Sequence, residues 1–339
     1  MTALSRRSFI MMSLALAACK PGAKTLDFSG LTMGTSYTVV AVDPSRKVDE
    51  AEAKAAIETA LALVNTQMSN WDSTSEISRF NAKTDLQPTR ISADLAKVMR
   101  AAEDVHLASE GRFDTTMGPL IELWGFGAKD RQGMASDAQI ADALSRSGHG
   151  STLSVGSNSL QKRRSDAQVY LSAIGKGYGA DQVGKALEAL GITDYMVEIG
   201  GDLYASGNNP GGTPWQIGIE KPAALSGGVL SVVPVSGHGL ASSGDYRNYF
   251  EQDGVRYSHL IDPVTGRPIS HKTASATVLA ENAMLADAWA TAMLILGREK
   301  GLEIASAHDV AVLFVERDAA STDLRFTTKA SARFQELTA

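Results

Sequence analysis

The order of the predicted secondary-structure elements is the strongest constraint on the fold of this chain. Short segments rich in β-branched and aromatic residues follow one another with glycine-containing turns between them, which predicts strands in runs. The predicted strands cover residues 36–42, 195–199, 202–206, 215–220, 228–235, 257–261, 274–280 and 310–315. Apolar residues at helical spacing predict helices between these runs, among them 48–68, 177–190 and 283–296. This order is typical of an α+β fold with a mixed, largely antiparallel sheet and flanking helices.

Composition and motif content exclude several classes of protein. The 339 residues are 44% hydrophobic and 21% charged, which is enough apolar sequence for a sizeable core. The formal net charge of -6 argues against a surface that neutralises a phosphate backbone, so no nucleic-acid partner is expected. No G-x-G-x-x-G follows a predicted strand and no Walker-type loop is present, which disfavours the ordinary dinucleotide and P-loop folds.

The first residues are typical of an export signal. The pair Arg6-Arg7 precedes an apolar run over residues 9–18, and a small-residue stretch then leads to Cys19, the only cysteine. This run is about half as long as a helix that spans a bilayer needs to be. The arginine pair resembles a twin-arginine signal, and the stretch that ends at Cys19 resembles a bacterial lipobox. The alternative, a short buried helix with a stray cysteine, does not account for the coincidence of these features.

We therefore expect three parts in this chain. Residues 1–18 form the export signal, residues 19–26 form a lipidated tether, and residues 27–339 form one large domain. Acyl chains on Cys19 would anchor the domain on the periplasmic side of the membrane. Because the chain has no second cysteine, the exported domain has no disulfide and depends on its core for stability.

The last predicted helix contains one carboxylate in a nearly all-apolar sequence. Asp287 and Thr291 are four residues apart, so they lie on one face of that helix. A carboxylate and a hydroxyl together suit a hard cation such as Mg²⁺, which prefers oxygen ligands. In the alternative interpretation, Asp287 bonds to first-turn amides and Thr291 bonds to a backbone carbonyl. These two residues alone leave both interpretations open.

A second candidate group is His259 at the predicted end of a strand. The following Asp-Pro and Thr-Gly pairs indicate a tight connection, so this segment could be only a hairpin loop. A histidine in such a position is also suited to accept a proton near neutral pH.

Three other segments could bind a ligand or could simply pack. Arg112-Phe113-Asp114 is a glycine-bounded polar stretch that alone could be a helix C-cap and turn. Met33 before the first predicted strand and Trp71 after the first predicted helix could be ordinary core anchors.

Together these segments resemble the FAD:protein FMN transferase family, the exported flavin transferases also called the ApbE family. The resemblance covers essentially the whole exported domain, in order. It rests on Met33-Gly34-Thr35-Ser36-Tyr37, Met68-Ser69-Asn70-Trp71, Phe113-Asp114 with Gly118-Pro119-Leu120, Ile174-Gly175-Lys176-Gly177-Tyr178, Ile199-Gly200-Gly201, Ser243-Gly244-Asp245-Tyr246, His259-Leu260-Ile261-Asp262-Pro263 and Ala286-Asp287-Ala288 with Thr291.

The resemblance implies a Mg²⁺-dependent enzyme that takes FMN from FAD and attaches it through a phosphoester to a threonine or serine of another protein, releasing AMP. It implies metal ligation by the Asp287 carboxylate, the Thr291 hydroxyl and the Ala173 carbonyl, and deprotonation of the acceptor by His259. The implied acceptor is an exported protein such as a subunit of a membrane redox complex. The implied flavin and adenine contacts are Met33, Trp71, Arg112, Phe113, Asp114, Lys176 and Ile261.

This chain departs from the family pattern at two positions. Tyr170 and Ala290 stand where relatives carry acids, which affects the expected nucleotide affinity and the number of metals. Two other functions fit the same residues. Water could replace the acceptor, giving an FAD pyrophosphatase, or the chain could be a flavin-binding lipoprotein without catalysis.

Overall fold

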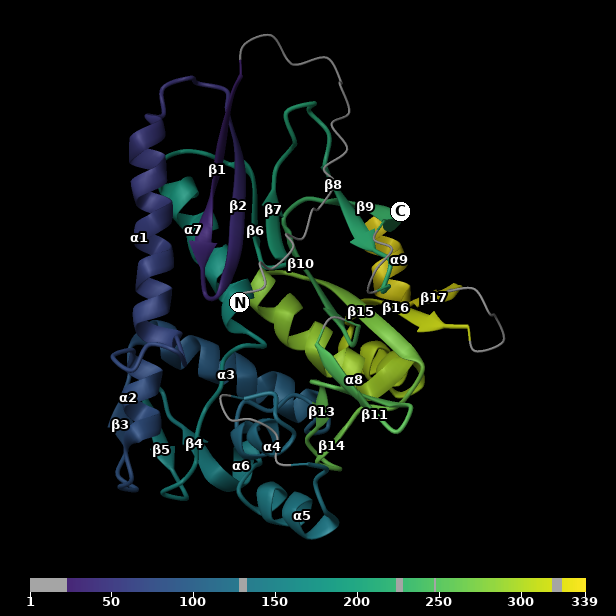
Figure 1. The fold of residues 1–339 in the computed structure, drawn as a ribbon. Helices are drawn as coiled ribbons and strands as arrows, with labels where there is room; N and C mark the ends of the chain where they lie inside the picture. Colours follow the sequence, from purple (N-terminus) through teal and green to yellow (C-terminus); the bar gives the residue numbers. More distant parts are fainter. Residues whose placement is uncertain (1–22, 128–132, 224–227, 247, 319–324) are drawn as a thin grey trace, which may run out of the picture.

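An eight-stranded sheet runs through the protein (Figure 1). The structure is a computed structural model that describes residues 23–127, 133–223, 228–246, 248–318 and 325–339. All neighbouring strands of this sheet are antiparallel, which confirms the predicted α+β fold. In spatial order the strands are β1 (Lys24–Thr32), β2 (Thr35–Asp43), β6 (Asp194–Ile199), β7 (Asp202–Ser206), β10 (His238–Gly244), β15 (Thr273–Ala280), β16 (Ala311–Arg317) and β17 (Phe326–Ala330).

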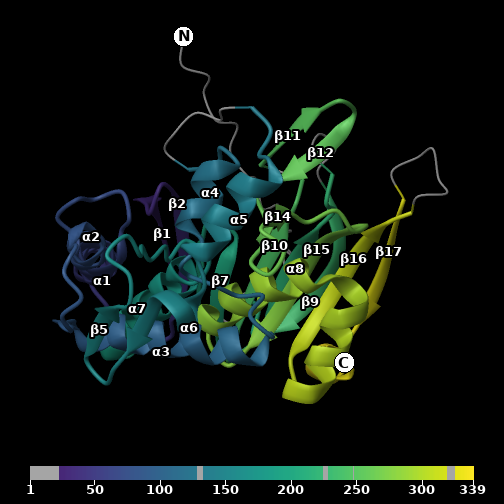
Figure 2. The same ribbon diagram turned by 90° about the horizontal axis from the view of Figure 1, so that it is seen from below.

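Helices cover the sheet and connect its strands. Figures 1 and 2 show α1 and α7 beside β1, β2 and β6, and α8 along β10 and β15. The helices of the described residues are α1 (Glu50–Met68), α2 (Glu76–Ala82), α3 (Ala93–Ala108), α4 (Gly118–Leu123), α5 (Asp137–Ser145), α6 (His149–Thr152), α7 (Gly175–Ala189), α8 (Ala283–His308) and α9 (Ala332–Thr338).

Small sheets surround the large one, and two of them show that one predicted strand is interrupted. The predicted strand at 257–261 is wrong, because the chain leaves one hairpin and enters another there. The N–H of Leu260 bonds to the Ser258 hydroxyl at 3.0 Å, which ends the extended pairing. The small-sheet strands are β3 (Thr89–Arg90), β4 (Leu153–Val155), β5 (Ser159–Lys162), β8 (Trp215–Glu220), β9 (Val229–Val235), β11 (Tyr249–Gln252), β12 (Val255–Ser258), β13 (Ile261–Asp262) and β14 (Arg267–Pro268).

The large sheet is buried on both faces. In β2, Val39 and Ala41 belong to a core cluster with residues of α1 and α7. Val40 and Val42 of the same strand point the other way, into a cluster with residues of β8, β9 and α9. Because side chains alternate along a strand, one sequence run serves two cores.

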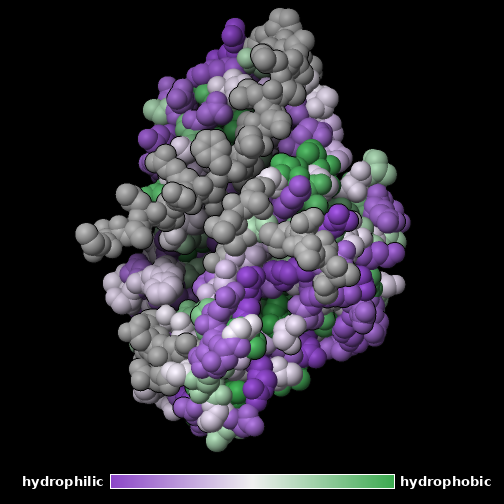
Figure 3. Space-filling model, turned by 45° about the vertical axis from the view of Figure 1, so that its right-hand side comes forward, coloured by the Kyte–Doolittle hydropathy of each residue, from purple (hydrophilic) through white to green (hydrophobic). Residues whose placement is uncertain are grey.

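The start of β1 shortens the predicted tether. The strand begins at Lys24, so residues 24–26 belong to the sheet. The predicted signal at 1–18 and Cys19 lie outside the described residues. Among the described helices, none is long and apolar enough to cross a membrane. The face in Figure 3 carries mostly hydrophilic side chains, with hydrophobic ones in small separate patches.

The last long helix, α8, consists of two helical segments that meet at Gly297. Gly297 has φ of 73°, which breaks the helical geometry, so the first segment ends at residue 296 as predicted. The second segment, which continues to His308, was not predicted.

The helices α7 and α8 cross in close contact at two glycines. A Cβ on Gly177 of α7 would overlap the carbonyl oxygen of Ala283, and one on Gly239 of β10 would overlap the Ala283 backbone. Asp181 of α7 accepts hydrogen bonds from the N–H groups of Ala283 and Met284 at 2.8 and 3.0 Å. The first turn of α8 is therefore wedged between two glycines and capped by the neighbouring helix.

We expect Gly177→Ala to destabilise the protein by about 3 kcal/mol, because the added methyl must push α7 and α8 apart. Gly150→Ala is the control, since a Cβ there meets nothing within 4 Å. Thermal and denaturant unfolding measure both variants. Equal stability of the two variants would contradict the close crossing.

Candidate active site

One buried carboxylate, Asp287, lies where the first turns of α7 and α8 meet. Its side chain is 4% exposed, and Oδ2 accepts a hydrogen bond from the Gly177 N–H at 3.2 Å. The Lys176 ammonium lies 3.5 Å from both carboxylate oxygens. The residue before α7, Ile174, provides no side-chain cap, so Asp287 supplies that function from the next helix.

The alternative interpretation, in which Asp287 bonds first-turn amides, holds for the Gly177 amide of α7 and fails for the amides of its own helix, α8. The first-turn amides of α8 bond to Asp181 and to the Asn282 side chain. Thr291, one turn along α8, places its hydroxyl 3.2 Å from the hydroxyl of Ser243 at the end of β10. The predicted face with one carboxylate and one hydroxyl is present, and a second hydroxyl adjoins it.

The charge balance around Asp287 leaves the carboxylate short of positive charge. Burial and the nearby Asp202 carboxylate raise the pKa of Asp287 to about 7, against the opposing effect of Lys176. Burial alone would lower the pKa of Lys176, but Asp202 and Asp287 together raise it above its ordinary value. Lys176 therefore stays protonated, and Asp287 is the group that an added cation would stabilise in its ionised form.

His259 has a free nitrogen that can accept a proton. Its Nδ1 lies 2.9 Å from the Asn248 carbonyl, which can only accept, so Nδ1 carries the hydrogen and Nε2 is the basic atom of the neutral ring. Burial lowers the pKa of His259, while the charges of Asp245 and Lys176 act on it in opposite directions. The histidine directly follows β12, and its N–H bonds to the Asn248 carbonyl, which holds it against the β11–β12 hairpin.

Two apolar side chains lie at the turns that flank the site. Trp71 is 81% exposed in the link between α1 and α2, so the expectation that it is an ordinary core anchor is wrong. Met33 occupies the turn between β1 and β2 with φ of 48°, and its methyl lies over Gly179 of α7. The Asn65 amide bonds to Thr32 at 3.0 Å, which joins this turn to the end of α1.

Four other predicted contact residues are engaged within the protein. Arg112 pairs with Asp262 at 2.6 Å, which brings the segment after α3 to the β13–β14 hairpin. Phe113 and Ile261 are buried in separate core clusters. Asp114 accepts bonds from Thr116 and from the backbone of His149.

Two asparagines fix the segment that carries Ala173, and sequence reasoning missed them. Asn70 donates to the Val169 carbonyl at 2.7 Å and accepts from the Leu171 N–H at 3.0 Å. Asn81 makes two further bonds with Val169, both at 2.8 Å. The sequence signal was the Asn70-Trp71 pair, but its partners lie 99 and 101 residues away. Residue spacing along the sequence could not reveal these distant partners.

Tyr170 and Ala290, the two departures from the family pattern, both pack against other residues of the protein. The Tyr170 ring lies against Gly118 at the start of α4, and its hydroxyl bonds to Gln168 at 3.1 Å. Ala290 is fully buried in the apolar cluster between α8 and the sheet. An acid at position 290 would need a charged or polar partner in that cluster.

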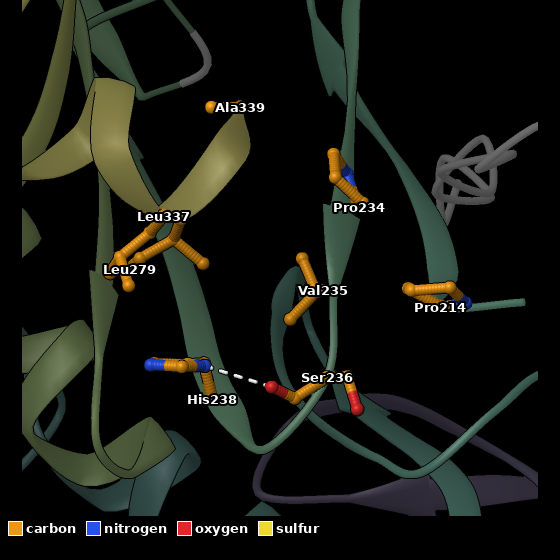
Figure 4. A pocket seen from close by; sticks show the side chains of 8 residues that line it. All are labelled: Pro214, Pro234, Val235, Ser236, His238, Leu279, Leu337 and Ala339. Carbon is orange, nitrogen blue, oxygen red and sulfur yellow. Dashed lines mark hydrogen bonds between the residues drawn. The ribbon is translucent and has the colours of Figure 1, made fainter.

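A cavity of about 220 Å³ lies on the other face of the sheet (Figure 4). It is lined by residues of β9, β10 and α9, among them Val235, His238 and Leu337. His238 and Ser243 lie at opposite ends of β10. The cavity is therefore separate from the cluster around Asp287.

Comparison with known proteins identifies the family. The ApbE family profile matches residues 33–314, a range that contains every site residue named above from Met33 to Thr291. The chain belongs to the ApbE family. An ApbE-family relative from Haemophilus influenzae, named FAD:protein FMN transferase, is 43% identical over 336 residues, which cover 97% of this chain and 96% of the relative.

Other members of the ApbE family agree in sequence and in structure. A relative of the same name from Escherichia coli K12 is 37% identical over 312 residues, covering 90% of this chain and 87% of its own. The solved flavin transferase ApbE from Vibrio cholerae has a TM-score of 0.84 and 38% identity, covering 93% of this chain and 99% of that chain. The apo flavinyl transferase ApbE from Pseudomonas stutzeri has a TM-score of 0.83 and 36% identity, with 93% and 97% covered.

Proposed function

We propose that this enzyme transfers FMN from FAD to a threonine or serine hydroxyl of an acceptor protein and releases AMP. The name of the curated relatives supports transfer of FMN from FAD to a protein. The observation that carries the proposal is the buried charge cluster of Lys176, Asp202 and Asp287. This cluster is net negative, so with an added divalent cation it suits a pyrophosphate, and His259 supplies a proton acceptor.

We further propose that Mg²⁺ is held by the Asp287 carboxylate, the Thr291 hydroxyl and the Ala173 carbonyl. All three are oxygen donors, which Mg²⁺ prefers. The Gly177 N–H, which in a continued helix would bond to Ala173, donates to Asp287 instead and leaves that carbonyl available. Mg²⁺ bound there would neutralise charge on the transferred phosphoryl group and on the AMP leaving group.

The described residues contain no group of three or more histidine, cysteine or acidic side chains that could hold a metal. The proposed site has a different composition, one carboxylate with a hydroxyl and a carbonyl. Substrate phosphates and water would complete the octahedron of a magnesium ion there.

Two side chains of the protein would take part in the transfer, one as a proton acceptor and one as a fixed positive charge. The acceptor oxygen forms a bond to the FMN phosphorus while the bond from that phosphorus to AMP breaks. Nε2 of His259 accepts the proton that the acceptor hydroxyl loses. Lys176 supplies a fixed positive charge near the phosphates, and its two carboxylate partners prevent it from losing its proton.

The exposed ring of Trp71 and the thioether of Met33 offer polarisable surfaces for the flavin or adenine rings. Contacts at both ends of FAD would hold its central phosphates beside Asp287, so orientation as well as charge would favour transfer.

We also propose that the enzyme acts on the periplasmic side of the membrane, anchored through lipid on Cys19, on an exported acceptor such as a subunit of a membrane redox complex. The twin-arginine-like and lipobox-like residues before Cys19 support this location. The anchor would precede the first strand by only a few residues.

Asp287→Asn keeps the shape of the side chain and removes its charge. We expect AMP release from FAD at saturating Mg²⁺ to fall about 100-fold or more, because the proposed cation loses its charged ligand. Asp142→Asn is the control, an exposed carboxylate that pairs with Arg146 inside α5. Mass spectrometry of the acceptor separates the functions, since covalent FMN indicates transfer and free FMN indicates hydrolysis. Unchanged AMP release in Asp287→Asn would contradict the assignment.

His259 should determine how the transfer rate depends on pH. A base must be neutral to accept a proton, and burial lowers the pKa of this group below its usual 6.5. We expect the single-turnover rate to rise with pH through that lowered pKa and to be level near neutral pH. His259→Gln should slow transfer by about 10²-fold or more, abolish this rise and retain FAD binding. A wild-type pH profile in the variant would exclude His259 as the base.

Cys19→Ala tests the proposed anchor. We expect the variant to move from the membrane fraction to the soluble fraction with its specific activity retained, because the acyl chains supply the membrane affinity. Fractionation with a salt wash and an activity assay measures both. A variant that stays with the membrane after the wash would contradict lipid anchoring at this residue.

A further inference from the structure

The ammonium of Lys176 lies between two buried carboxylates at unequal distances. It is 2.7 Å from Oδ2 of Asp202 and 3.5 Å from Oδ1 of Asp287. Both carboxylates are nearly inaccessible, with side-chain exposures of 6% and 4%. The nearer contact is an ion pair with Asp202, while Asp287 presents both of its oxygens to the ammonium at 3.5 Å. Lys176 is therefore shared between the two carboxylates.

A tight turn places Asp202 under the start of α7. The link between β6 and β7 is Gly200-Gly201, with φ of 58° and 102°, a left-handed region that favours glycine. Asp202 is the first residue of β7 and pairs with Ile199 across this turn. The turn thus fixes the backbone of Asp202 independently of α8, the helix that carries Asp287.

This arrangement decides which group neutralises Asp287. If Lys176 paired with Asp287 alone, the two charges would cancel, and a divalent cation would have to displace the ammonium to reach the carboxylate. With Asp202 present, the ammonium is shared, so the three groups carry a net charge of about -1 and Asp287 is only partly compensated. The Gly177 N–H is the other donor to that carboxylate.

We propose that Asp202 is a positioning residue that competes with Asp287 for Lys176 and thereby keeps the Asp287 carboxylate only partly compensated and available to a divalent cation. The inference rests on the proposed function, because it concerns the same cation site. Asp202 acts through Lys176 and is not itself a ligand of the cation. No sequence pattern pointed to this role, since the aspartate, the lysine and the second aspartate come from β7, α7 and α8.

The test measures binding of Mn²⁺, a spectroscopic substitute for Mg²⁺, by electron paramagnetic resonance in the absence of FAD. We expect Asp202→Asn to weaken Mn²⁺ binding about 10-fold or more, because Lys176 moves onto Asp287. Asp202→Glu, which retains the charge, should recover most of the affinity. Asp194→Asn is the control, a carboxylate at the start of β6 that bonds to the Asn208 backbone.

Repeating the measurement in a Lys176→Met variant separates the positioning role of Asp202 from misfolding and from direct ligation of the cation by Asp202. With Lys176→Met there is no ammonium to restrain, so adding Asp202→Asn should change Mn²⁺ affinity less than about 2-fold. A loss of 10-fold in both backgrounds would make Asp202 a ligand and overturn the positioning role. If Mn²⁺ affinity falls in Asp287→Asn but not in Asp202→Asn, only this inference is overturned. If Mn²⁺ affinity is unchanged in Asp287→Asn, both the inference and the proposed cation site are overturned.

Discussion

The candidate site of this enzyme depends on the contact between α7 and α8, where each helix carries an aspartate that caps the other. Asp181 of α7 caps α8, and Asp287 of α8 caps α7, so each helix begins where the other supplies its missing acceptor. The absence of a side chain on Gly177 permits this approach. Because the first turn of a helix carries partial positive charge, the crossing favours a buried carboxylate between the two helices. The same geometry that stabilises the fold therefore places the acidic group at the site.

The remaining groups reach this crossing from elements that are far apart in the sequence. The β6–β7 turn brings Asp202 to Lys176, and the end of β10 brings Ser243 to Thr291. The β11–β12 hairpin holds His259 with its basic nitrogen free. Rigid backbone features position each of these side chains, which is the arrangement that orientation-dependent phosphoryl transfer requires. Trp71 differs, because it is exposed and would gain a packing partner only when a ligand or another protein covers it.

Sequence patterns predicted what depends on neighbours along the chain and missed what depends on distant partners. The β-branched and aromatic residues of β2 and the apolar spacing in α1 predicted elements that the structure contains. The spacing of Asp287 and Thr291 correctly predicted one helical face. The break after Ser258, where the Ser258 hydroxyl accepts from the Leu260 N–H, was missed. The second segment of α8 was also missed, and there the Arg298 N–H bonds to the distant Thr273 hydroxyl. The amide bonds of Asn70 and the pairing of Lys176 with Asp202 were invisible because their partners are far away in the sequence. The family resemblance supplied the candidate ligands, and the structure supplied their charge balance.

The central claim is that the carboxylate at the α7–α8 crossing receives the divalent cation that serves FAD. A crystal of the exported domain grown with Mn²⁺ and FAD, with anomalous diffraction recorded at the manganese edge, tests it most directly. The account predicts one strong anomalous peak in ligand contact with Asp287, Thr291 and the Ala173 carbonyl, touching the pyrophosphate of FAD. A peak elsewhere, with Asp287 still bonded only to Gly177 and Lys176, would contradict it.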